Sequence, residues 1–205
     1  MKKTILLTIV MTAVLALALT ISAFAAEELT DTTTIGATSQ APKLLSLIFN
    51  GGSLAILGAA LAVGLAGIGS AKGVGMAGEA TAGLLSENPN LFGKSFVLMA
   101  LPMTQGIYGL VIAFLIVLKV GLFADGMAAF VNLPVADGAY YLMSALPIAV
   151  VGLISAIKQS RVAVAGINLL SKRPDQVGKA ITSAALVETY AIFALLISVL
   201  LVLMG

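Results

Sequence analysis

The feature that most constrains the fold is a series of long apolar runs, each long enough to cross a membrane as a helix. A membrane-spanning helix needs about 20 apolar residues. The runs predict helices over 45–84, 91–121, 138–170 and 177–204. Only 10 % of the residues are charged, against about 25 % in soluble domains. No alternating barrel pattern appears, so the fold class is an all-α integral membrane protein with four transmembrane helices.

Composition also limits the chemistry that the chain can carry. Cysteine and histidine are absent, which excludes disulfides, thiolate chemistry and the usual nitrogen ligands of zinc, copper and haem. Any metal site must therefore use oxygen ligands. The formal net charge of +2 is too small to indicate a nucleic-acid partner.

The N-terminus reads as a signal peptide over residues 1–25. Lys2 and Lys3 precede an apolar stretch, and the small residues Ala23 and Ala25 then form a cleavage pattern. The alternative is a retained transmembrane helix. Residues 26–44 are rich in Thr and Ser and predict a polar extracytoplasmic segment.

The breaks between the apolar runs divide the rest of the chain into two helical hairpins. Prolines interrupt the runs near 86–90 and 171–175, so the hairpins span 45–121 and 138–205, joined by a connection over 122–137. Basic residues cluster around the two turns: Lys72, Lys94, Lys158, Arg161, Lys172, Arg173 and Lys179. The positive-inside rule then predicts cytoplasmic turns and extracytoplasmic mature termini in the cell membrane.

The two hairpins are copies of each other. An ungapped shift of the chain by 85 residues aligns these pairs: Gly67 with Gly152, Ser70 with Ser155, Pro89 with Pro174, Lys94 with Lys179, and Thr104 with Thr189. Each copy has two spans, so the repeats are parallel rather than inverted. The copies differ at one informative place, where Glu188 stands opposite Met103 and Gln159 opposite Val74.

Glu188 lies deep in the last apolar run, where a carboxylate is costly unless a partner neutralises it. Counting outward from the turns puts Gln159 at the same depth as Glu188, and the repeat puts Thr104 and Gln105 there too. Thr104, Gln105 and Tyr108 follow a spacing of three and four residues that places them on one helix face. Lys72, Lys158 and Arg161 fall near the same level and must turn away from lipid. These groups predict a functional site inside the membrane.

The oxygen ligands at this level suit an alkali cation. Pro102 cannot donate to Leu98, so a main-chain carbonyl in the adjoining turn joins one carboxylate, two amides and a hydroxyl. One negative charge matches one Na⁺, whereas a divalent ion would leave excess charge in lipid. A proton needs only Glu188 and one acceptor, and H⁺ remains the alternative cargo. The first and third helices are rich in glycine and alanine, which suits helices crowded in an inner ring.

Three stretches, Gly67–Glu79, Leu101–Phe114 and Val187–Ala191, resemble the proteolipid rotor subunits of V-type ATPases. The likeness is to the sodium-translocating bacterial kind, the K or c proteolipid of the membrane ring, and covers about residues 52–205. It implies that Na⁺ is held by Glu188, Gln159, Gln105, Thr104 and the main-chain oxygen of Leu101, with Tyr108 hydrogen-bonded to Glu188. The implied carbonyl, that of Leu101, differs from the one the proline argument frees. Lys158 and the N-terminal extension depart from the family pattern.

The resemblance also implies a mechanism and partners. Copies of the chain would form a ring in the lipid bilayer, facing a stator membrane subunit with an arginine and joined by a central-stalk subunit to the ATPase head. The chain has no phosphate-binding Gly-rich motif, so ATP hydrolysis belongs to those partners and this subunit is not itself an enzyme. One acid per duplicated hairpin moves few ions per turn and favours ATP-driven pumping.

Two other functions are open on the sequence alone. A stand-alone secondary transporter could use Glu188 and would work as a monomer or dimer. A purely structural membrane scaffold would tolerate Glu188→Gln with its role intact.

Overall fold

The computed structural model describes residues 50–205. The predictions for 1–25 and 26–44, and the first residues of the predicted first helix, lie outside this part of the chain. Within 50–205 four helical spans are long and apolar enough to cross a membrane: Gly51–Glu87, Pro89–Lys119, Val135–Lys172 and Pro174–Met204. The all-helical, four-span fold predicted from the apolar runs is therefore confirmed.

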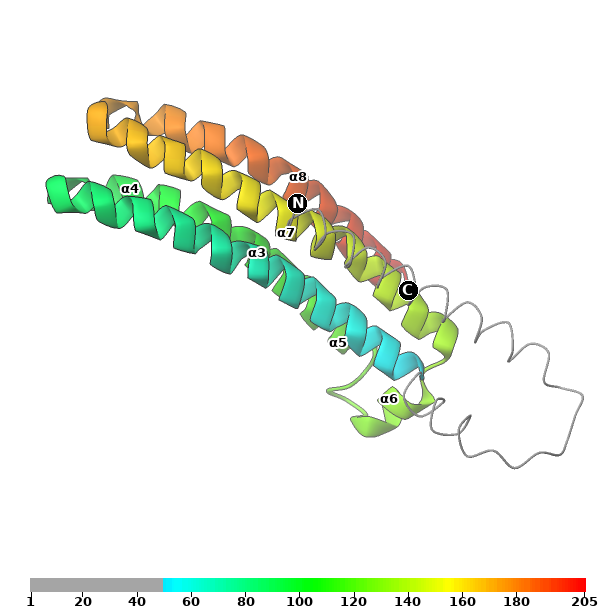
Figure 1. The fold of residues 1–205 in the computed structure, drawn as a ribbon. Helices are drawn as coiled ribbons and strands as arrows, with labels where there is room; N and C mark the ends of the chain where they lie inside the picture. The colour runs from blue at the N-terminus through cyan, green and yellow to red at the C-terminus, as the bar shows by residue number, and fades with distance from the viewer. Residues whose placement is uncertain (1–49) are drawn as a thin grey trace, which may run out of the picture. The chain divides into compact units, whose positions relative to one another are not determined.

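The first hairpin consists of α3 (Gly51–Glu87), α4 (Phe92–Ala100) and α5 (Thr104–Lys119). The second consists of α7 (Val135–Lys172) and α8 (Val177–Met204). Figure 1 shows the two hairpins side by side, with α3 next to α7. Both hairpins therefore point the same way, as parallel repeats require.

The two turns have the same backbone geometry. Asn88 (φ −136°, ψ 76°) and Arg173 (φ −141°, ψ 78°) each end a helix, and each is followed by a proline that opens a short 3₁₀ helix. Their N–H groups donate to Leu84 and Leu169, 2.9 and 2.8 Å away. A residue before proline avoids the α region, so the sequence itself stops each helix at this point. The duplication seen in the sequence extends to the turns.

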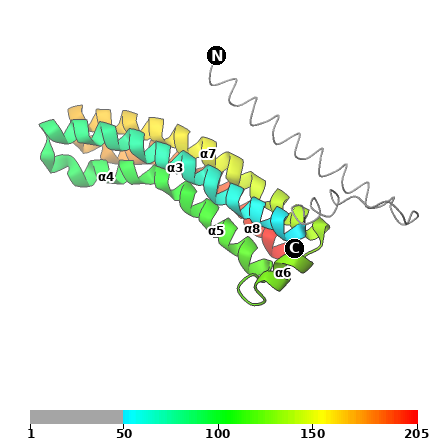
Figure 2. The same ribbon diagram turned by 60° about the horizontal axis from the view of Figure 1, so that its bottom comes forward.

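Close approach of α3 to α7 depends on glycine. A Cβ on Gly69 would lie 2.7 Å from the carbonyl oxygen of Leu153, and one on Gly73 would lie 3.0 Å from that of Ala156. Small residues let membrane helices approach to backbone contact in this way. The α3 and α7 helices thus form one tightly packed layer, flanked by α4 and α5 on one hairpin and by α8 on the other (Figure 2).

Two apolar clusters fill the interior on either side of a polar layer. One cluster includes Ala62, Ile112 and Ile148, and the other includes Leu98, Ala163 and Ile167. Between them along the helices lie Gln105 and Gln159, both fully buried. The clusters separate this polar layer from both ends of the hairpins.

The connection between the hairpins contains an element that the sequence reading did not assign. A short helix, α6 (Met127–Asn132), lies within the predicted connection 122–137. Gly126 precedes it with φ +57°, a conformation that glycine adopts without steric cost. Pro134 follows and begins the entry to α7.

Candidate ion-binding site

Glu188, on α8, accepts two hydrogen bonds from side chains of other helices. The hydroxyl of Tyr108 on α5 donates to Oε1 at 2.6 Å, and Nε2 of Gln159 on α7 donates to Oε2 at 3.3 Å. Both carboxylate oxygens are thus held in fixed positions by the neighbouring helices. The level-counting prediction that Gln159 and Glu188 meet is correct in this geometry.

The two glutamines form the buried base of the site. Nε2 of Gln105 donates to Oε1 of Gln159 at 2.6 Å, and Nε2 of Gln159 also donates to the carbonyl of Ala184 at 3.2 Å. Both side chains are 0 % exposed. Oε1 of Gln105, however, has no hydrogen-bond partner anywhere in residues 50–205. A buried acceptor without a partner costs about 1–3 kcal/mol, and a bound cation would remove that cost.

The helix is locally broken beside the glutamines. Residues Leu101–Met103 form a 3₁₀ turn around Pro102 between α4 and α5. The carbonyl of Leu101 accepts from the backbone N–H of Thr104 and from its hydroxyl, at 3.0 Å for the latter. The two oxygens of Leu101 and Thr104 are therefore adjacent, as the family resemblance implies. The proline-based expectation had pointed instead to the carbonyl of Leu98.

Two serines support the site, and the sequence reading gave neither a role. Ser70 on α3 accepts from the N–H of Gly106 at 2.8 Å, which satisfies a donor left free by the break at Pro102. Ser155 on α7 donates to the carbonyl of Val187 at 3.2 Å, next to Glu188. The two serines align in the repeat. A polar residue kept in both copies was the signal that could have identified them.

The charge of Glu188 is not balanced by a basic side chain. Within the part of the chain that the structure describes, its only partners are Tyr108 and Gln159, and it forms no ion pair. Lys72, Lys158 and Arg161 are exposed on α3 and α7. An acid in the middle of an apolar helix needs a neutralising cation or proton.

The donor set fits a monovalent cation. Among residues 50–205 no group of three or more His, Cys, Asp or Glu side chains gathers at one place, as a transition-metal site would require. The oxygens present are one carboxylate, two amides, one hydroxyl and one main-chain carbonyl, from Glu188, Gln105, Gln159, Thr104 and Leu101. Hard, mostly neutral oxygens of this kind suit an alkali ion.

Comparison with known proteins agrees with this reading of the fold. A model of the ATP synthase C family, which describes the C-type proteolipid of ATP synthases, matches residues 57–116 and again 142–201. The starts of the matches, and their ends, both differ by 85 residues, the period of the internal repeat. The family model therefore finds the same two hairpins.

Two curated relatives are similar over most of the chain. V-type sodium ATPase subunit K of Enterococcus hirae is 49 % identical over 155 residues, which cover 75 % of this chain and 94 % of that protein. A-type ATP synthase subunit K of Methanocaldococcus jannaschii is 40 % identical over 154 residues, covering 72 % and 61 %. With both hairpins matched, this chain belongs to the ATP synthase C family, as a non-catalytic, ion-transporting membrane proteolipid with two copies of the family hairpin.

Proposed function

We propose that the chain is the Na⁺-carrying rotor-ring subunit of a rotary V-type ATPase, with one ion carried per copy on Glu188. The observation that carries this proposal is the buried, unpartnered Oε1 of Gln105 in the same layer as Glu188. A proton carrier needs no additional acceptor oxygens, whereas a sodium ion needs several. One of the relatives is named a sodium ATPase subunit, which supports the same cargo.

In this mechanism the residues of the chain have distinct tasks. Glu188 supplies the negative charge, and Gln105, Gln159, Thr104 and the main-chain oxygen of Leu101 replace the water around the ion. Tyr108 holds Oε1 of Glu188 in place through its 2.6 Å hydrogen bond. The loaded site is electrically neutral, so it can pass through lipid as the ring turns. Release follows when Glu188 meets an arginine of a stator membrane subunit.

The second hairpin alone carries the acid, which bears on the direction of work. Moving one charge against 100 mV costs about 2.3 kcal/mol. A ring with one acid per four helices moves fewer ions per turn and can drive each against a steeper gradient. We therefore propose ATP-driven pumping, with the ring joined by a central stalk to the ATPase head. The cytoplasmic turns and a plasma-membrane location belong to the same proposal.

Carbodiimide labelling of Glu188 tests the cargo. Labelling is measured with and without Na⁺ at one fixed pH, with K⁺ as the ionic-strength control. Protection by Na⁺ at constant pH supports the proposal. Protection that follows pH and ignores Na⁺ would assign the protein to proton transport instead.

The mass of the detergent-solubilised assembly tests the rotor assignment separately. A ring of many copies agrees with the proposal. A functional monomer or dimer would favour a stand-alone secondary transporter that uses Glu188.

A further inference from the structure

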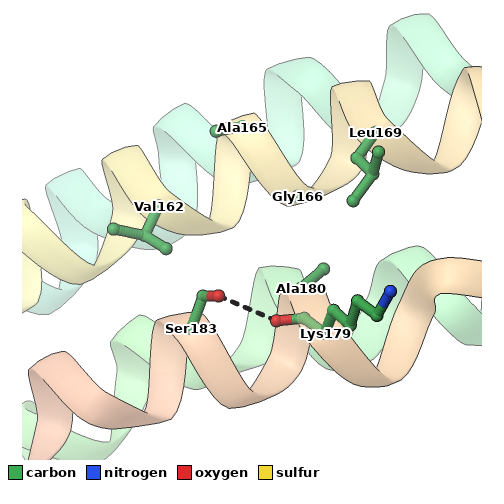
Figure 3. A pocket seen from close by; sticks show the side chains of 7 residues that line it. All are labelled: Val162, Ala165, Gly166, Leu169, Lys179, Ala180 and Ser183. Carbon is green, nitrogen blue, oxygen red and sulfur yellow. Dashed lines mark hydrogen bonds between the residues drawn. The ribbon is translucent and has the colours of Figure 1, made fainter.

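The second hairpin carries an open groove between α7 and α8. The groove is lined by Val162, Ala165, Gly166, Leu169, Lys179, Ala180 and Ser183 (Figure 3). The hydroxyl of Ser183 donates to the carbonyl of Lys179 at 2.8 Å. The ammonium group of Lys179 has no partner among residues 50–205. The groove is mostly apolar and has one free cation at its edge.

The same groove exists on the first hairpin, and there it is filled. Subtracting the repeat period of 85 gives its lining as Ala77, Ala80, Thr81, Leu84, Lys94, Ser95 and Leu98. Five of these seven residues are buried. They pack in one cluster with Ala163, Ile167 and Leu170 of α7, so the second hairpin occupies the groove of the first.

The lysine at the edge of the filled groove is also paired. Nζ of Lys94 donates to the carbonyl oxygen of Pro174, in the turn of the second hairpin, at 2.9 Å. Lys179 is the repeat equivalent of Lys94, and Pro89 is the equivalent of Pro174. This contact joins two different surfaces, one on each hairpin. A contact of this head-to-tail kind generates a ring when it is repeated with a rotation that closes.

We propose that the groove on the second hairpin receives α3 of a second copy of this chain, and that Lys179 donates to the carbonyl of Pro89 in that copy. The inference rests on the ring of the proposed function and assigns its interface. The residues of the second copy that enter the groove are the equivalents of Ala163, Ile167 and Leu170, namely Gly78, Ala82 and Leu85. None of these three is buried within a single copy.

The exposed face of α3 has the composition that this contact requires. A Cβ added to Gly64, Gly67 or Gly75 would meet no atom within 4 Å, so their surface is open in one copy. Their repeat equivalents on α7, Ala149, Gly152 and Ser160, are all buried against the rest of the chain. The contact between Gly69 and Leu153 then predicts that Ile154 meets Ile68 of the next copy. Ile68 is 61 % exposed and Ile154 is 47 % exposed in one copy.

The interface between copies carries no second ion site at the level of Glu188. Tyr190 and Phe193 stand where the first hairpin has Gln105 and Tyr108, and Met103 stands where the second has Glu188. Tyr190 and Phe193 form an edge-on aromatic pair with centroids 6.5 Å apart. All three side chains are exposed in a single copy, and the next copy would bury them as an apolar seal.

Disulfide trapping tests the groove, because the chain has no native cysteine. The double variant Ile68→Cys with Ile154→Cys is assembled into the full complex and mildly oxidised, and the products are separated on a non-reducing gel. We expect a ladder of dimers, trimers and larger species. The matched control is Ile107→Cys with Ile154→Cys, which replaces the exposed α3 position by an exposed α5 position. A ring of normal mass without the ladder would overturn the interface and leave the rotor assignment standing. Absence of any ring would overturn both.

Two lysine variants test the hydrogen bond. We expect Lys179→Met to speed dissociation of the detergent-treated ring by about 2-fold to 10-fold, the usual worth of one net hydrogen bond. Lys94→Met removes the equivalent bond within a copy and should leave dissociation between copies close to that of the unmodified ring. If Lys179→Met instead lowers the amount of bound anionic lipid and leaves ring dissociation unchanged, Lys179 binds a lipid phosphate and the proposed contact is wrong.

Discussion

The hydroxyl of Tyr108 lies 2.6 Å from Oε1 of Glu188, across the boundary between the two hairpins. The two residues are 80 positions apart in the chain. The bond fixes the carboxylate in the orientation in which its other oxygen faces Gln159. Any rotation of Glu188 toward a stator subunit must first break it.

Tyr108→Phe should therefore loosen the carboxylate while keeping the packing of the ring face. A hydrogen bond to a charged group contributes about 1.5–3 kcal/mol, so we expect Na⁺ to protect Glu188 about 10-fold to 100-fold less well. The measurement is the Na⁺ concentration that halves carbodiimide labelling. The control is Tyr190→Phe, since that hydroxyl has no partner at Glu188. Equal protection in both variants would show that Tyr108 has no locking role.

Glu188→Gln should abolish Na⁺ transport and leave the ring assembled. The amide removes the charge that attracts the ion and keeps nearly the same volume. Transport is measured as ²²Na⁺ uptake by reconstituted complex, and assembly as the mass of the ring. Glu79→Gln is the matched control, because Glu79 lies on α3 and takes no part in the site. Uptake that survives in Glu188→Gln would point to a structural role for the chain.

Gln105→Leu should shift the cargo preference toward protons. The substitution removes the unpartnered Oε1 and fills the same buried space with an apolar side chain. A proton on Glu188 needs no ligand from residue 105, so labelling should still respond to pH. We expect protection by Na⁺ to require at least about 10 times more Na⁺, the effect of one lost ligand worth about 1.4 kcal/mol. An unchanged Na⁺ requirement would remove Gln105 from the ligand set.

Most of the fold follows from simple features of the sequence. The apolar runs fix the four spans, and Pro89 and Pro174 fix the turns by excluding the helical conformation from the residues before them. Helix α6 was missed because it has only six residues and follows a glycine that reads as a loop. Short helices carry too little periodicity to be recognised.

The candidate site was predictable in its depth but not in its hydrogen bonds. Counting from the turns correctly brought Gln159 beside Glu188, because depth depends only on helical rise. Which carbonyl lies beside Thr104 depends instead on the local 3₁₀ geometry around Pro102, which the proline argument for Leu98 could not supply. The carbonyl of Ala184 and the roles of Ser70 and Ser155 depend on how the helices are rotated against one another, which periodicity alone does not fix.

Ser70→Ala should weaken the broken segment that holds the ligands. Oγ of Ser70 is the partner of the N–H of Gly106, and the side chain is only 6 % exposed, so its loss leaves a buried donor without an acceptor. An unsatisfied buried group costs about 1–3 kcal/mol, and we expect the melting temperature of the subunit in detergent to fall accordingly. Ser183→Ala is the matched control, because that hydroxyl is exposed and bonds only within its own helix. Since Gly106 directly follows Gln105, a weakened segment should also lower Na⁺ protection of Glu188. A drop in melting temperature with full Na⁺ protection would mean that Ser70 supports the fold and has no part in positioning the ligands.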